Sequence, residues 1–214
     1  MAEINKGWCK LNPDSGNGNG EVTVTGLSDN TGRTTRSVTA TFQATGVATP
    51  IVRTINQAGK TEFVDIPTTF VIPKTGGSGI RITGTSNSSA LTFSMAASPL
   101  KSYFEETYYL AASTITDNGD PIEGDPGSTA EFPLQLVFNS VPANSTTSAI
   151  TGQITITDNA GHIDICTVTQ TAGDPTISVD KVKVTLSWNA YDESDEEAFG
   201  ITSNTAWTIS AAIS

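Results

Sequence analysis

At 214 residues the chain is long enough for two domains, each with its own core. Hydrophobic residues make up 36% of the chain and charged residues only 15%, a composition that suits short strands with polar turns and disfavours long helices. The formal net charge of -11 argues against nucleic acid and against an anionic membrane surface as partners, because both are themselves negatively charged.

The opening residues predict where the protein is made. Residues 1–6 lack the charged-then-apolar pattern of a secretory signal, and no apolar run approaches the roughly 20 residues that cross a bilayer. Unless a leader has been removed, the sequence predicts a protein made and kept in the cytoplasm.

Apolar and polar residues alternate in five stretches, the pattern of half-buried strands in antiparallel sheets. Turn-forming clusters rich in Gly, Asn and Asp separate them, while residues 102–110 suit either a short helix or a strand entry. Strands at this spacing predict an all-β protein built from two immunoglobulin-like antiparallel sandwiches. In chain order the strands are 21–25, 37–42, 79–83, 149–157 and 164–169, and the turns are 13–20, 29–32, 76–79, 117–120 and 158–161.

Two internal similarities indicate a repeated unit. The motif around Gln57 and Gly59 returns around Gln170 and Gly173, and residues 86–94 return as 203–210. The repeat is out of phase with the ends of the chain. The chain begins part-way through one unit and ends part-way through another. We expect residues 60–173 to form one sandwich, inserted into a circularly permuted sandwich made by residues 1–59 and 174–214. In the alternative, residues 1–59 pair with residues 174–214 of a neighbouring copy.

Charge is consistent with pairing between the two outer segments. The opening segment carries five basic and four acidic residues, for +1, and the closing segment two basic and seven acidic residues, for -5. The alternating strands of each segment have an apolar face that the segment cannot bury alone.

The motifs of the outer segments resemble the BACON domain, an immunoglobulin-like module of Bacteroidetes surface proteins and their phages. Residues 8–59 are similar to its second half and residues 176–210 to its first half, whereas residues 61–173 look like one complete, diverged copy. The motifs concerned are Trp8, Pro13–Gly16, Asn30–Arg36 and Gln57–Gly59 at the start of the chain, and Ser203–Ser210 at its end.

This resemblance, together with the absent export signal, implies a virion protein. The expected function is an auxiliary capsid or head-fibre protein of a crAss-like bacteriophage, which decorates or stabilises the capsid surface without enzymatic activity. The expected partners are the major capsid protein or other virion proteins, together with further copies of the chain. The alternative function is a carbohydrate-binding adhesion module for host glycans.

The sequence contains few of the residues that known catalytic motifs use. His162 is the sole histidine and follows a predicted turn, where an exposed polar side chain is ordinary. No nucleophile elbow, phosphate-binding loop or zinc-protease motif is present, so we expect no enzyme and no cofactor.

Two acidic stretches, 117–125 and 192–197, could offer oxygen ligands to calcium. Neither has the spacing of a calcium loop, and runs of like charge are typical of solvated loops that protect strand edges. We therefore predict no metal site.

The tryptophan and cysteine residues receive different interpretations. Trp188 is the candidate for stacking on a sugar, whereas Trp8 and Trp207 are expected in sandwich cores. Cys9 and Cys166 lie in strand-like stretches and are predicted to be buried free thiols in different units.

Overall fold

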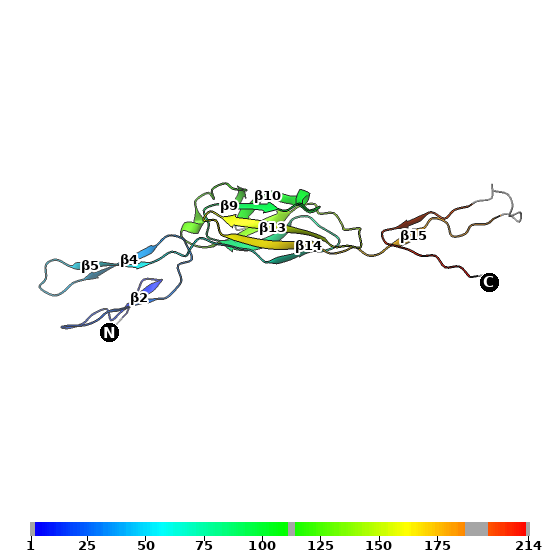
Figure 1. Ribbon diagram of the computed structural model, residues 1–214. Helices are drawn as coiled ribbons and strands as arrows, with labels where there is room; N and C mark the ends of the chain where they lie inside the picture. Colours follow the sequence, from blue (N-terminus) through cyan, green and yellow to red (C-terminus); the bar gives the residue numbers. More distant parts are fainter. Residues whose placement is uncertain (1–2, 111–113, 187–196, 213–214) are drawn as a thin grey trace.

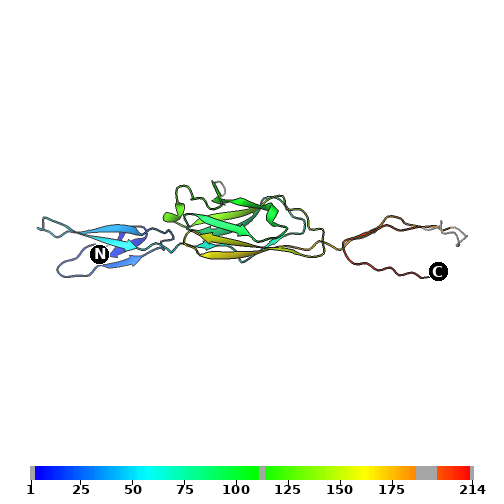
Figure 2. The ribbon, with the colours of Figure 1, turned by 45° about the horizontal axis from the view of Figure 1, so that its top comes forward.

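The structure is a computed structural model that describes residues 3–110, 114–186 and 197–212. It is all-β with antiparallel sheets, as predicted, and its helical segments are two short 3-10 turns, Lys101–Tyr103 and Pro126–Ser128. No helix in the described ranges is long and apolar enough to cross a membrane. The chain forms three units in a row, and its termini lie at opposite ends (Figures 1 and 2).

The central unit, residues 60–173, is an immunoglobulin-like sandwich of two sheets. One sheet has the strand order β11-β10-β12-β8-β6, and the other has the order β7-β14-β13-β9. All pairs are antiparallel except β14 with β7. The strands are β6 (Val64–Asp65), β7 (Thr69–Ile72), β8 (Ile80–Ser86), β9 (Leu91–Met95), β10 (Phe104–Leu110), β11 (Thr114–Asp117), β12 (Phe132–Phe138), β13 (Ile150–Asp158) and β14 (Ile163–Gln170).

The core of the central unit lies between these two sheets. Strand β9 shows the pattern, because Leu91, Phe93 and Met95 are buried while the residues between them are exposed. The ring of Phe93 packs edge-on against Tyr108 and Phe104, with ring centroids 5.9 and 5.5 Å apart. Such edge-on packing adds to the stabilisation that burial alone supplies.

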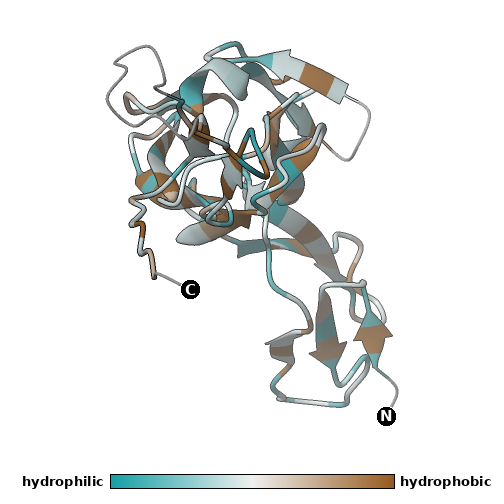
Figure 3. Ribbon diagram, turned by 90° about the vertical axis from the view of Figure 1, so that its right-hand side faces the viewer, coloured by the Kyte–Doolittle hydropathy of each residue, from teal (hydrophilic) through white to brown (hydrophobic). Residues whose placement is uncertain are grey.

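The N-terminal unit, residues 3–59, consists of two small sheets. Strands β1 (Ile4–Asn5), β2 (Cys9–Asn12) and β3 (Thr23–Gly26) pair in that order. Strands β4 (Arg36–Phe42) and β5 (Ile51–Gln57) form a separate hairpin. Figure 3 shows hydrophobic bands on the strands of this unit, which stands apart from the central sandwich.

The C-terminal unit, residues 174–212, has less regular structure. Strands β15 (Ile177–Val179) and β16 (Ile201–Ser203) pair antiparallel. Residues 206–210 alternate like a strand in sequence, but they form none here, and β16 pairs only with β15 among the described residues.

The two outer segments do not meet within one chain. Among the described residues, β1 to β5 pair only with one another, and β15 pairs only with β16. The two segments lie at opposite ends of the central sandwich (Figures 1 and 2). Closure of a permuted sandwich within one chain is therefore not observed, and closure between neighbouring copies stays a prediction.

Candidate assembly surfaces

The end of the N-terminal unit is organised by Asn30. Its side-chain Nδ2 donates to the carbonyl oxygens of Thr34, at 2.8 Å, and of Gln57, at 3.4 Å. Asn144, 114 positions later, donates to the carbonyl four residues further on, at 2.8 Å, and to that of Thr171, at 3.1 Å. The hairpins that follow, β4–β5 and β13–β14, therefore start from the same local structure.

The joint between the N-terminal and central units is centred on Asn87. This side chain is fully buried, and its Nδ2 donates to the carbonyl oxygens of Thr31, at 3.3 Å, and Lys60, at 3.4 Å. Its Oδ1 accepts the backbone N–H of Phe63, at 2.9 Å. One amide thus connects the N-terminal unit, through Thr31, with the start of the central unit at residues 60–63.

The joint between the central and C-terminal units repeats this arrangement around Asn204. Its Nδ2 donates to the carbonyl oxygens of Ser145, at 2.7 Å, and Asp174, at 2.9 Å, and its Oδ1 accepts the N–H of Thr176, at 2.8 Å. Residues 145 and 174 lie 114 positions after residues 31 and 60, which make the same bonds at the first joint. The three units are therefore connected by one kind of joint, used twice.

A cleft of about 740 Å³ separates the two sheets of the N-terminal unit. The side chains that line it include an apolar group, and several of them are open to solvent: Phe42 is 43% and Ile51 54% exposed. The β3 residue Val24 of the same unit is 46% exposed. The apolar lining residues are Ile4, Leu11, Pro13, Val22, Val38, Ala40, Phe42, Ala44, Val47 and Ile51.

The C-terminal unit also leaves apolar side chains uncovered. Trp207 is 49% and Ile209 79% exposed, and Phe199 and Ile177 are exposed as well. The expectation that Trp207 lies in a sandwich core is therefore wrong for the single chain, because among the described residues no second sheet covers it. Trp8 is partly buried, with the Arg36 guanidinium 5.0 Å from the centre of its ring.

Other residues singled out in the sequence have ordinary structural surroundings. His162, with a side chain 55% exposed, places Nδ1 2.8 Å from the buried Asp158 carboxylate and so closes the β13–β14 hairpin. Trp188, the candidate glycan-stacking residue, lies outside the described residues.

The acidic stretch 117–125 is dispersed over separate contacts. Asn118 exchanges two hydrogen bonds with the backbone of Phe93, each at 2.8 Å, while Asp125 forms an ion pair with Arg33. In the second acidic stretch, residues 192–196 are outside the described ranges. Within these ranges no group of three His, Cys, Asp or Glu side chains is placed to hold a metal ion.

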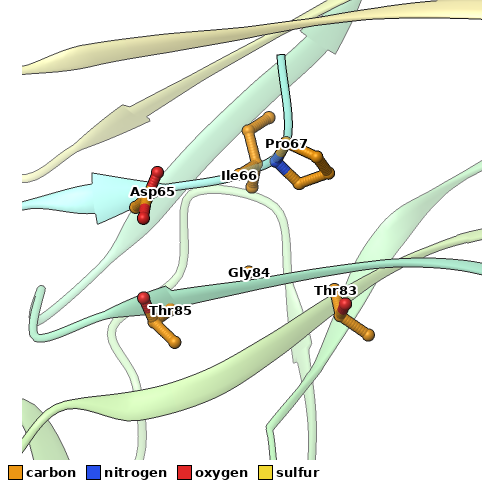
Figure 4. A pocket seen from close by; sticks show the side chains of 6 residues that line it. All are labelled: Asp65, Ile66, Pro67, Thr83, Gly84 and Thr85. Carbon is orange, nitrogen blue, oxygen red and sulfur yellow. The ribbon is translucent and has the colours of Figure 1, made fainter. Parts of the chain in front are cut away.

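A second, shallower pocket of about 410 Å³ lies beside β6 and β8 of the central unit (Figure 4). Its lining offers one carboxylate, Asp65, together with the hydroxyls of Thr83 and Thr85. General acid–base chemistry uses a positioned proton donor and acceptor near the reacting atoms, and this lining supplies one titratable side chain. The pocket lining is Asp65, Ile66, Pro67, Thr83, Gly84 and Thr85.

Both cysteines are free thiols and fully buried, as predicted. Cys9 lies in the N-terminal unit and Cys166 in the central sandwich. Burial, with a smaller contribution from the nearby Asp164 carboxylate, raises the pKa of the Cys166 thiol to about 11. This thiol is therefore neutral and packs as a small apolar side chain.

Comparison with known proteins assigns the chain to no family. No protein-family model matches the chain, and no curated protein matches it significantly. The surfaces that invite a functional interpretation are thus the uncovered apolar faces of the two outer units.

Proposed function

We propose that the chain is a non-enzymatic structural protein of a virion surface, an auxiliary capsid or head-fibre protein of a crAss-like bacteriophage with BACON-like units. The partners in this proposal are the major capsid protein or other virion proteins. The motifs that resemble BACON units carry the assignment to a virion.

The observation that carries the structural role is the repeated joint. Asn87 and Asn204 each donate to two carbonyl oxygens at equivalent positions and accept one backbone N–H at the two ends of the central sandwich. A row of sandwiches fixed end to end by buried or partly buried amides suits a spacer or decoration protein, because it holds its ends apart. The uncovered apolar faces of the outer units suit contacts with other proteins.

Purified phage particles test this proposal. We expect mass spectrometry of gradient-purified particles to find the chain at a stoichiometry comparable with other structural proteins, and immunogold labelling to place it on the head. Absence of the chain from such particles, when it is abundant in the infected cell, would refute the virion assignment.

Carbohydrate binding is the second candidate, favoured by the half-exposed indole of Trp207. Indole rings bind sugars by stacking when one face is open. A glycan array with the full chain and its Trp188→Ala and Trp207→Ala variants tests it. Sugar binding that depends on either ring would support adhesion to glycans, whereas an array without signal would remove this candidate.

A further inference from the structure

We propose that the N-terminal unit of one copy is completed by the C-terminal unit of a second copy, head to tail, as one composite sandwich. The inference rests on the proposed structural function and names its partner as the same chain. It follows from treating the central sandwich as the template for the two incomplete units.

The first sheet of the composite sandwich follows from the order β10-β12-β8-β6 in the central unit. Strands β2 and β3 pair as β10 and β12 do, and β15 and β16 pair as β6 and β8 do. Ile177 lies opposite Ser203 just as Val64 lies opposite Ser86. In the template Leu136 lies opposite Ile82. The same register sets Phe199 of the second copy opposite Val22, which gives the order β2-β3-β16-β15.

Burial in the template supports this first sheet. Residues 22, 24 and 27 are exposed, whereas residues 136, 138 and 141, each 114 positions later, are buried. On the donor side, Phe199 is exposed, whereas its counterpart Ile82 on β8 is fully buried. The exposed apolar side chains on both partners are those that the central sandwich buries at the same positions.

The second sheet follows from the order β14-β13-β9. The hairpin β5–β4 corresponds to β14–β13, and residues 207–211 correspond to β9. In the template Phe93 lies opposite Ile156 and Leu91 opposite Asp158. The same register sets Ile209 of the second copy opposite Phe42.

In this register the exposed apolar residues of the C-terminal segment become buried. Trp207 and Ile209 take the places of Leu91 and Phe93, which are 0% and 6% exposed. The alternation of apolar and polar residues in 207–211 then matches that of β9, with Thr208 and Ser210 outward. A strand forms there once it has an edge to pair with, as in strand addition between chains.

The structure favours a second copy of the chain as the partner of each outer unit. The two outer units of one chain are held at opposite ends of a sandwich whose β13 strand has nine residues, about 30 Å at roughly 3.3 Å per residue. The two joints keep them apart, so one chain does not close on itself. The outer segments also carry opposite net charge, +1 and -5, which favours their association.

Two full-length variants test the head-to-tail arrangement. Phe42→Asp disables the accepting face and Ile209→Asp the donating strand, because each buries a charge in the composite core. By light scattering after size-exclusion chromatography, the unmodified chain should form oligomers that grow with concentration. Each variant alone should be a monomer, and a mixture refolded together should stop at a one-to-one dimer. Thr208→Asp, on the outward side of the same segment, should assemble like the unmodified chain.

Disulfide trapping tests the register. The template pair Thr155 and Ser94 are direct cross-strand partners, and their counterparts are Thr41 and Ser210. Directly paired strand residues have Cα atoms close enough for a disulfide, so a Thr41→Cys chain mixed with a Ser210→Cys chain should give a cross-linked dimer. Ser37→Cys, about 13 Å further along β4 at roughly 3.3 Å per residue, should not.

The outcomes separate this inference from the proposed function. A chain that stays monomeric at all concentrations and gives no Thr41–Ser210 cross-link overturns the head-to-tail pairing, even if the chain is found in virions. Growth into oligomers that Ile209→Asp leaves intact also overturns it. Head-to-tail pairing of a chain absent from virions would instead refute the virion assignment and leave the pairing in place.

Discussion

Asn87 illustrates how one side chain fixes the position of two units. It is fully buried and makes hydrogen bonds to two separate segments, at Thr31 and at residues 60–63. Removing its amide leaves the partly buried carbonyl and N–H groups at the joint without this partner, which costs about 1–3 kcal/mol. We therefore expect Asn87→Ala to lower the free energy of unfolding by about that amount in urea titrations.

The matched control for this substitution is Asn204→Ala. Asn204 makes the same bonds in a more exposed setting, where water replaces a lost partner. The loss in a monomeric chain should therefore be smaller than for Asn87→Ala. Equal losses would contradict the role assigned to burial at the first joint.

Cys166 predicts a loss of stability in alkali. Burial raises its pKa in the folded chain to about 11, above the usual value of roughly 8.5 in an unfolded chain. Above pH 9 the unfolded chain releases this proton and the folded chain retains it, so stability falls as the pH rises. The loss should be about 3 kcal/mol by pH 11, at 1.36 kcal/mol for each pH unit between the two pKa values.

Urea unfolding between pH 8 and pH 11 measures this effect, with Cys166→Ala as the comparison. The variant is destabilised at every pH by the lost volume, and its stability should change less with pH than that of the unmodified chain. Identical pH slopes in the two proteins would show that the thiol is not responsible. Tyr108 adds to the slope in both proteins, because burial raises its pKa to about 12.

At the scale of elements, Gly32 lets the N-terminal unit approach the central sandwich. A Cβ at this position would overlap the backbone of Thr129, and the carbonyl of Gly32 accepts the N–H of Lys60 at 2.8 Å. Gly32→Ala should therefore displace the N-terminal unit without unfolding the central core. We expect faster proteolysis near residues 57–63 and an altered maximum dimension in small-angle X-ray scattering.

The control for the joint is Gly16→Ala. A Cβ at Gly16 meets no atom within 4 Å, so this variant should keep the scattering curve and the protease resistance of the unmodified chain. If Gly32→Ala behaves in the same way, the close approach at Thr129 does not set the position of the unit.

Single strands were predictable where alternation coincides with a local partner. The stretches 37–42, 149–157 and 164–169 form β4, β13 and β14 within one or two residues of the predicted bounds, because each belongs to a hairpin whose partner is close in sequence. Residues 206–210 have the same alternation and form no strand, since a strand also requires a sheet edge that the sequence pattern does not locate. The repeat motifs in the sequence indicated that the two outer segments are incomplete units. The hydrogen bonds of Asn87 could not be predicted, because they join segments that are distant in sequence.

At the scale of the whole molecule, the units should unfold separately. The central sandwich has its own core, whereas the N-terminal unit gains its cover from a second copy in our proposal. Calorimetry should therefore show two transitions, and the one that belongs to the N-terminal unit should move to higher temperature with protein concentration. In Ile209→Asp it should not move. One transition, independent of concentration in both proteins, would contradict this arrangement.

The repeated joint has a consequence for symmetry. If the same hydrogen bonds connect every pair of neighbouring units, each step along an assembly of copies applies the same rotation and translation. Each copy contributes two units in total, one complete and two halves, yet the assembly would repeat after a single unit. The diffraction pattern of such a helical assembly would then show layer lines for a step of one unit. The two-unit period of the chain would be visible only through the side chains that differ between the complete and the composite sandwiches.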